Sequence, residues 1–302
     1  MNNSKNKKKA TIKNAFSGAL ITAMLTACVP SEGVQTATAS QRDFTLGTSS
    51  FSASECRRYF QRYGFQDSRV EVDVSGWSPQ NPALGYIREL NYHLTRALVG
   101  AGSSSSVYNL LVEASSINAF TDPQPSNGGP SPAYMSAAIL SSVAYAYDYL
   151  AARYDAQDLE AVRLWGNRLE DNVDLPFEAQ MLDSRGAIAS SRLAWGAASD
   201  QPRIFDAGLT ELRRVLARAL DNDMFFQPGD ARMNTEVFNH VIAGATIARL
   251  NGVNVYGWQT RSGSTVHDLV SAQVEAALAS GRTPVSVAET ALMVPGAETT
   301  LM

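Results

Sequence analysis

The chain has few of the residues that bind zinc or form disulfides. Its 302 residues include two cysteines, Cys28 and Cys56, and three histidines, His93, His240 and His267. These residues form no CxxC or HxxxH spacing, and no Gly-Xaa-Ser-Xaa-Gly elbow or phosphate loop occurs. Two cysteines cannot build a disulfide framework. We therefore expect no metal site and no cofactor.

Lysine is absent from most of the chain, because all five lysines lie in the first 13 residues, where no acid occurs. Ala15–Ala27 then forms a run of small and apolar residues, about 20 Å long as a helix, whereas a permanent membrane span takes about 20 residues. A basic start followed by a short apolar run is typical of an export signal. The run ends in Leu25-Thr26-Ala27-Cys28, which resembles the bacterial lipobox.

The resemblance implies that residues 1–27 are a lipoprotein signal peptide and that Cys28 is lipidated and becomes the new N-terminus. Two or more acyl chains suffice for stable anchoring. An ordinary secretory signal with a chance cysteine is the alternative. Val29 follows the cysteine, which favours the outer membrane in a Gram-negative cell, facing the periplasm or the cell surface. Cys56 is left without a partner in the chain.

The chain after residue 27 is strongly acidic. Losing five of the 25 basic residues leaves 20 arginines against 29 acids, so the formal charge changes from −4 to −9. Non-specific binding to nucleic acid or anionic lipid needs a basic face. We therefore expect no nucleic-acid partner and membrane contact through the lipid anchor only, and a polyanionic ligand would require a local cluster of arginines.

Apolar residues recur at three- and four-residue steps through most of the chain after residue 81, which predicts helices. Strand signals are sparse, and Arg69–Val74 is the best short alternation. The expected helices are Pro82–Val99, Val107–Phe120, Pro132–Tyr154, Asp155–Val173, Ala187–Ala198, Pro202–Leu220, Met233–Leu250 and Thr265–Ala279. The fold class is therefore all-α, and these patterns alone do not choose between a helix bundle and an α/α toroid.

Four regions are expected after the signal peptide. Residues 28–54 are rich in Ser, Thr, Ala and Gly and are typical of a flexible tether. Residues 55–81 form an irregular N-terminal segment, and 82–279 form the helical domain. Residues 280–302, which contain no aromatic residue, form a C-terminal tail in which disorder is one expectation.

The order of segments in the helical domain is similar to that of the alginate lyase family of polysaccharide lyases, over about Pro82 to Thr265. The segments that carry the resemblance are Ser190–Ala198, Arg203–Asp206, Asp221–Pro228, Arg232, Phe238–His240 and Leu250–Val253. The resemblance implies an incomplete α/α toroid whose inner helices line a cleft for a uronate polymer. It also implies cleavage by β-elimination, in which the carboxylate is neutralised, a base removes the C5 proton and an acid protonates O4.

The catalytic motifs of that family are only partly present. Its Asn-Asn-His motif falls on Ser190–Arg192, shortly before Trp195. Its arginine followed after seven residues by Tyr-His falls on Arg232, Asn239 and His240, so the catalytic tyrosine is replaced by asparagine.

The resemblance still implies a catalytic set of His240, Arg232, Arg192 and Asn239. The two arginines would neutralise a substrate carboxylate, which suits the planar guanidinium. His240 would be the base at neutral pH. The alternatives are a surface or inter-helix role for Arg192, a loop-capping role for Arg232 and a structural role for His240.

Three aromatic residues, Tyr145, Tyr149 and Trp195, are candidates for substrate binding, because aromatic rings stack on sugars. Tyrosines in a long apolar helix are also typical of a protein core. Both roles stay open for these residues.

The sequence thus favours a lipid-anchored lyase of an acidic, alginate-like polysaccharide. One alternative is a catalytically degenerate envelope lipoprotein that binds the polysaccharide or assists its export. Another is a structural envelope lipoprotein without a sugar ligand. A cleft lined by Arg192, Arg232, His240 and tyrosines would favour the first two, and a filled centre would favour the third.

Overall fold

The computed structural model describes residues 44–46, 82–122, 132–173, 182–221 and 231–279. Within these ranges the chain forms eight α-helices, one short 3-10 helix and no strand. The all-α prediction is therefore confirmed for the described residues. The predicted signal peptide, Cys28, the strand candidate Arg69–Val74 and the C-terminal tail lie outside them.

The structure contains a helix at each position that the sequence predicted between residues 82 and 279. The helices are α3 (Pro82–Leu98), α4 (Ser104–Ser116), α5 (Pro132–Ala151), α6 (Ala156–Asp171), α7 (Leu182–Ala198), α8 (Pro202–Asp221), α9 (Ala231–Leu250) and α10 (Val266–Ala279), and the 3-10 helix η4 is Val255–Gly257. The largest differences in boundaries are at α7, which begins at Leu182 rather than at Ala187, and at α4, which is Ser104–Ser116 rather than Val107–Phe120. The early start of α4 has a local cause: the Ser103 hydroxyl accepts a hydrogen bond from the Ser105 N–H at 3.1 Å, which satisfies a free donor of the first turn.

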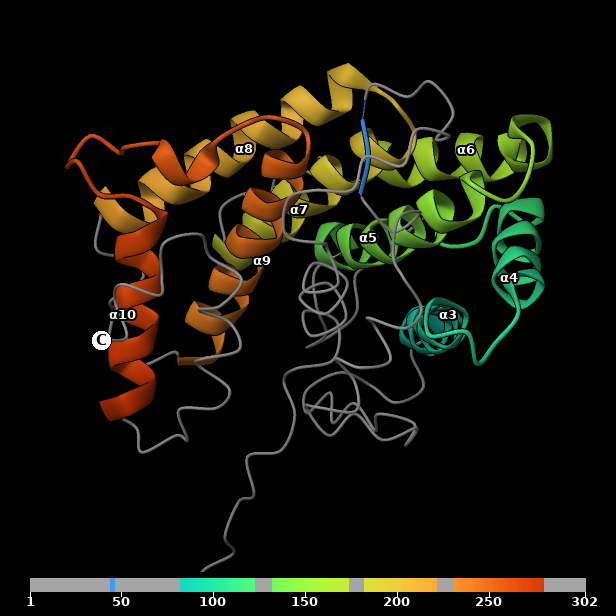
Figure 1. Cartoon of the computed structure of the whole chain (residues 1–302), viewed down its shortest axis with the longest axis horizontal. Helices are drawn as coiled ribbons and strands as arrows, with labels where there is room; N and C mark the ends of the chain where they lie inside the picture. The colour runs from blue at the N-terminus through green and yellow to red at the C-terminus, as the bar shows by residue number, and fades with distance from the viewer. Residues whose placement is uncertain (1–43, 47–81, 123–131, 174–181, 222–230, 280–302) are drawn as a thin grey trace, which may run out of the picture.

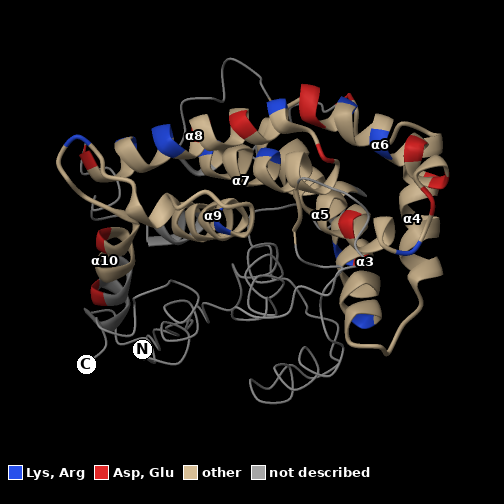
Figure 2. Cartoon of the chain, turned by 45° about the horizontal axis from the view of Figure 1, so that its top comes forward, with Lys and Arg blue, Asp and Glu red and all other residues tan. Residues whose placement is uncertain are grey.

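The helices form a broad arch (Figures 1 and 2). Helix α7 lies between α5 and α9, while α6 and α8 cover the upper side of this row, α3 and α4 lie at one end and α10 at the other. The most extensive helix contacts are those of α7 with α8, α5 and α9. Helix α7 is therefore the centre of the packing.

Helix α5 is an inner helix, as its apolar sequence predicted. Nearly all of its side chains are buried, including Tyr145, Tyr147 and Tyr149. Leu140, Val143 and Leu150 are completely buried. Burying such side chains stabilises the fold by about 1.5–3 kcal/mol each.

Close contacts around α7 depend on glycine. A Cβ added to Gly166 of α6 would collide with the ring of Trp195, and one added to Gly208 of α8 would lie 2.7 Å from the Leu193 nitrogen. Trp195 and Leu193 are both fully buried, so neither can move aside easily. The two glycines therefore allow α6 and α8 to approach α7 closely.

Residues 44–46 pack against the helical domain. Thr45 donates its N–H to the Asn251 side-chain oxygen at 2.8 Å, and the Asn251 amide donates back to the Thr45 carbonyl at 2.9 Å. The Leu46 side chain is only 2% exposed. The tether predicted over 28–54 is therefore not free along its whole length, because the hydrogen bonds with the Asn251 side chain and the burial of Leu46 fix this short segment.

Candidate functional site

Two of the predicted site residues, His240 and Arg192, are separated by α7, because Ser190 and Arg192 lie on opposite faces of that helix. Residues two positions apart in an α-helix project about 200° apart. Ser190 accordingly faces His240 of α9, with 3.1 Å between its hydroxyl oxygen and the imidazole Nδ1. Arg192 instead pairs with Glu170 of α6, its Nε lying 2.8 Å from a carboxylate oxygen. The structure therefore separates Arg192 from His240.

His240 lies where α5, α7 and α9 meet. A Cβ added to Gly186 of α7 would be 3.1 Å from the His240 Cβ, so the glycine makes room for the histidine. The ring of Tyr134, from α5, meets the imidazole edge to face with 6.1 Å between ring centroids. We name His240, Ser190 and Tyr134 the histidine cluster.

Ser190 favours one tautomer of the imidazole. Its hydroxyl lies 3.1 Å from the Ala187 carbonyl, one turn earlier in α7, as well as near His240. A serine has one O–H to donate. When this O–H is donated to the Ala187 carbonyl, the Ser190 oxygen accepts the Nδ1–H of His240. The Nε2 atom of the imidazole then carries the lone pair. This arrangement leaves Nε2 as the proton acceptor.

Burial also controls the charge of His240. His240 is half-buried, and the loss of water around its imidazole lowers the pKa from 6.5 to about 4. His240 is therefore neutral at pH 7. A neutral imidazole beside a phenol can accept one proton while the phenol delivers another.

The remaining catalytic candidates belong to the same helix as His240. Asn239 is partly exposed and directly precedes the histidine, and Arg232 lies in the first turn of α9. The side chain of Arg232 is outside the described part of the chain. The structure thus places Asn239 next to the histidine cluster.

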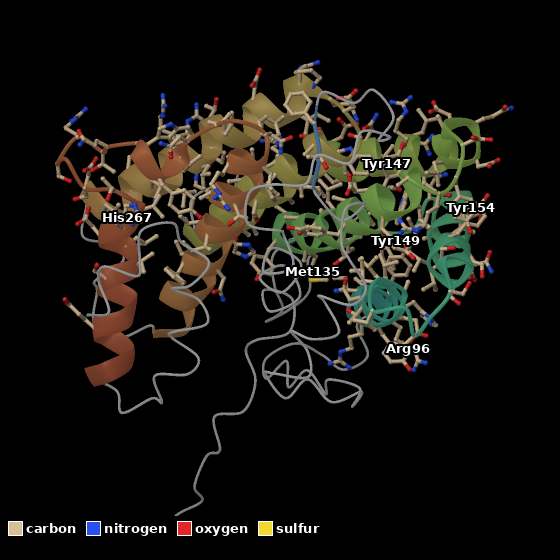
Figure 3. The ribbon with its side chains drawn as sticks, in the orientation of Figure 1. Arg96, Met135, Tyr147, Tyr149, Tyr154 and His267 are labelled. Atoms are coloured by element: carbon tan, nitrogen blue, oxygen red, sulfur yellow. The ribbon has the colours of Figure 1, made fainter. Side chains whose placement is uncertain are left out.

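The three aromatic candidates are core residues in this conformation. Trp195 is fully buried and donates its indole N–H to Asn167 at 2.9 Å. Tyr145 is 2% exposed, its hydroxyl has no hydrogen-bond partner among the described residues, and burial raises the pKa of its phenol. Tyr149 lies where α5 passes above α3 (Figure 3), with the Arg153 guanidinium 3.7 Å from its ring centre. No ring face of Tyr145 or Trp195 is open for stacking on a sugar.

Sequence analysis missed Tyr134 and the two arginines that surround Arg192 in space. Tyr134 comes from the opposite end of α5 from the tyrosines that were singled out, so no local pattern marks it. Arg185 and Arg192 are seven residues apart on one face of α7, and Arg214 lies on the facing side of α8. The helical spacing of Arg185 and Arg192 is a signal that could have found that pair.

Within the described ranges no group of three or more His, Cys, Asp or Glu side chains is arranged to hold a metal ion. None of the described helices is both long and apolar enough to cross a membrane.

Comparisons with known proteins add no family. The chain matches no known family, no curated protein and no solved structure at a significant level. The function is therefore inferred from the sequence resemblance and from the geometry of the site.

Proposed function

We propose that this chain is a lipid-anchored protein of the bacterial cell envelope that cleaves an acidic, uronate-containing polysaccharide by β-elimination. The observation that carries the proposal is the histidine cluster, in which Ser190 orients a neutral His240 beside the phenol of Tyr134. Tyr134 offers the phenol that the sequence lacks at Asn239. The incomplete α/α toroid belongs to the same proposal and is supported by the inner row of α5, α7 and α9.

Each group has a defined role in the proposed reaction. The C5 proton of the uronate moves to Nε2 of His240, the electron pair left on C5 forms the C4–C5 double bond, and the C4–O4 bond breaks. Tyr134 gives its proton to the departing O4. Because a pKa of about 4 makes His240 a weak base, the C5 proton must first be acidified by neutralising the carboxylate. Asn239 and Arg232 are the groups of α9 proposed for that task.

A second candidate function is binding of the polysaccharide without cleavage. It is favoured by the position of Arg192, which Glu170 holds on the far side of α7 from the histidine cluster. The burial of Tyr145 and Trp195 removes both rings from sugar binding in either candidate. The two candidates share a ligand class and differ in chemistry.

An elimination assay on the purified mature chain separates the two. Incubation with alginate and other polyuronates should release unsaturated ends that absorb ultraviolet light, and His240→Ala and Tyr134→Phe should each abolish this signal while leaving circular dichroism unchanged. Tyr154→Phe is the matched control, because Tyr154 stacks on Tyr108 of α4 at 4.5 Å (Figure 3) and follows the end of α5 opposite to Tyr134. Retention on immobilised polymer without any unsaturated product would support binding alone, and the absence of both would refute both candidates.

A further inference from the structure

The helical domain holds the short segment 44–46 at three successive residues (Figure 1, blue). The ring of Phe44 meets the ring of Phe205 in α8, with 4.8 Å between the centroids. Thr45 forms two hydrogen bonds with Asn251, the residue that follows α9. The side chain of Leu46 is buried. We name the surface formed by Phe205 and Asn251 the peptide site.

Asn251 binds the main chain of Thr45. Its side-chain oxygen accepts the Thr45 N–H at 2.8 Å, and its NH2 group donates to the Thr45 carbonyl at 2.9 Å. A residue of a β-ladder pairs through its N–H and C=O in the same way. Side chains two positions apart lie on one face of an extended chain, as Phe44 and Leu46 do here. The peptide site therefore recognises one residue by its backbone and the two flanking residues by their apolar side chains.

The helices hold both residues of the peptide site in place without help from the segment. The NH2 group of Asn251 also donates to the Ile247 carbonyl at 2.7 Å, one turn earlier in α9. An amide NH2 has two N–H donors, so α9 fixes one of them and the other is left for Thr45. Phe205 is buried against the end of α7, where a Cβ added to Gly196 would lie 2.9 Å from the Phe205 Cβ. A site that is already oriented lowers the entropic cost of binding.

We infer that the peptide site is a reversible binding site for an extended peptide that carries an aromatic and an aliphatic residue two positions apart, and that its occupant is the chain's own segment 44–46. The contacts are two hydrogen bonds, one ring pair and one buried leucine. Their combined gain is similar in size to the entropic cost of ordering three residues. Docking is favoured because the segment is covalently tethered and so has a high effective concentration. The segment therefore exchanges between a docked and a released state.

Release of the segment changes the reach of the proposed lipid anchor. From Cys28 the chain runs 16 residues to Phe44 but 54 residues to Pro82, where α3 begins. At about 3.5 Å per residue, release raises the largest possible distance between lipid and helical domain from about 55 Å to about 190 Å. This consequence rests on the proposed function for the anchor, whereas the peptide site itself requires neither lipid nor elimination chemistry.

Binding of a synthetic peptide with the sequence of residues 40–48 to the mature chain tests the inference. Thr45→Pro in the protein should empty the site, because proline has no N–H to donate to Asn251. Ligand-observed NMR should then show at least about tenfold tighter peptide binding by Thr45→Pro than by the wild type, whose own segment competes. A peptide carrying both Phe44→Ala and Leu46→Ala should bind Thr45→Pro at least about tenfold more weakly, because it loses the apolar contacts.

The side chain of Asn251 offers a sharp variant with a matched control. Asn251→Asp, added to Thr45→Pro, should abolish peptide binding, because a carboxylate cannot donate to the Thr45 and Ile247 carbonyls. Asn254→Asp makes the same charge change three residues away, and its carboxylate can still accept the Gly257 N–H as Asn254 does at 3.2 Å. Amide hydrogen exchange is the second measurement: in the otherwise wild-type chain, Asn251→Asp should speed exchange of the Thr45 N–H about tenfold, and Asn254→Asp should leave it unchanged. Circular dichroism of every variant should match the wild type.

Several outcomes would overturn the inference. They are no peptide binding by Thr45→Pro, equal binding by Thr45→Pro and the wild type, or equal effects of Asn251→Asp and Asn254→Asp on peptide binding and exchange. Concentration-dependent dimers of the wild type that Asn251→Asp abolishes would show instead that the occupant is the segment of a second copy. The proposed function fails separately: if the peptide binds but polymers are not cleaved, the inference stands and the lyase proposal falls.

Discussion

At the residue scale, His240 illustrates how surroundings set the chemistry of a single side chain. In water an imidazole is partly protonated near neutral pH, but the packing of α5, α7 and α9 holds this one neutral and gives it a pKa of about 4. The Ser190 hydroxyl orients the imidazole ring by its hydrogen bond with Nδ1. His240 is therefore neutral at pH 7 and can accept a proton, but it is a weak base.

The lowered pKa of His240 predicts a loss of stability in acid. The unfolded chain binds a proton near pH 6.5, whereas the folded chain resists protonation until about pH 4. Above about pH 6.5 His240 is neutral in both states and does not affect the pH dependence of stability. As the pH falls from about 6.5 toward 4, the free energy of unfolding decreases by at most about 1.4 kcal/mol per pH unit. Thermal unfolding of the wild type and of His240→Gln, measured from pH 7 to pH 4, should show a shallower pH dependence in the variant.

His267→Gln serves as the control for this titration, because His267 lies on α10 near Tyr256 and touches no residue of the histidine cluster. It should retain the acid sensitivity of the wild type. Identical pH profiles for the wild type and His240→Gln would show that His240 titrates normally.

At the scale of single elements, α7 depends on the small residues that let its neighbours approach. Gly166 of α6 is the clearest case, since a Cβ there would collide with the Trp195 ring. That ring is fully buried and its N–H is held by Asn167. Overpacking at this contact should therefore strain both helices.

The substitution Gly166→Ala should lower the free energy of unfolding by about 1–3 kcal/mol, because methyl groups forced into a packed core shift the backbone. Chemical denaturation followed by circular dichroism measures this change. Gly85→Ala in α3 is the matched control: nothing lies within 4 Å of the added Cβ, so the better helix propensity of alanine should stabilise the chain by about 0.5–1 kcal/mol. Equal effects of the two substitutions would contradict the close packing of α6 on α7.

The positions of the helices could be predicted from the sequence, whereas some of the helix ends could not. Periodicity located every described helix, because the spacing of apolar residues follows from local geometry. The start of α4 was missed by three residues, because the cap formed by Ser103 and Ser105 lies in a serine run without apolar periodicity.

The site was harder to predict because it depends on contacts between distant segments. Tyr134, Ser190 and His240 come from three helices, and no local pattern shows that they meet. The resemblance identified His240 but also grouped it with Arg192, which the turn of α7 directs to the opposite face. Which faces meet is decided by tertiary packing, and this information is not contained in the spacing of a single helix.

At the scale of the whole molecule, charge and anchoring set the conditions for any acidic ligand. The part of the chain after residue 27 has a formal charge of about −9, which gives no long-range attraction for a polyanion. Binding must then depend on short-range contacts at local groups of arginines, such as Arg185, Arg192 and Arg214 between α7 and α8. The docked segment at Thr45 and Leu46 also limits the reach of the proposed anchor, because at about 3.5 Å per residue the stretch from Cys28 to Phe44 spans at most about 55 Å.

The proposed anchor itself predicts that Cys28 carries all of the lipid. In cells supplied with labelled palmitate, the wild-type chain should incorporate the label and fractionate with membranes, and Cys28→Ser should lose both properties because the substituted residue cannot be acylated. Cys56→Ser is the natural control, since Cys56 is the only other cysteine of the chain, and it should behave as the wild type does. Label in Cys28→Ser, or its loss in Cys56→Ser, would refute lipidation at Cys28. Because the chain after residue 27 has a net charge of about −9, the unlipidated chain should be released into the aqueous fraction rather than held at an anionic membrane by charge.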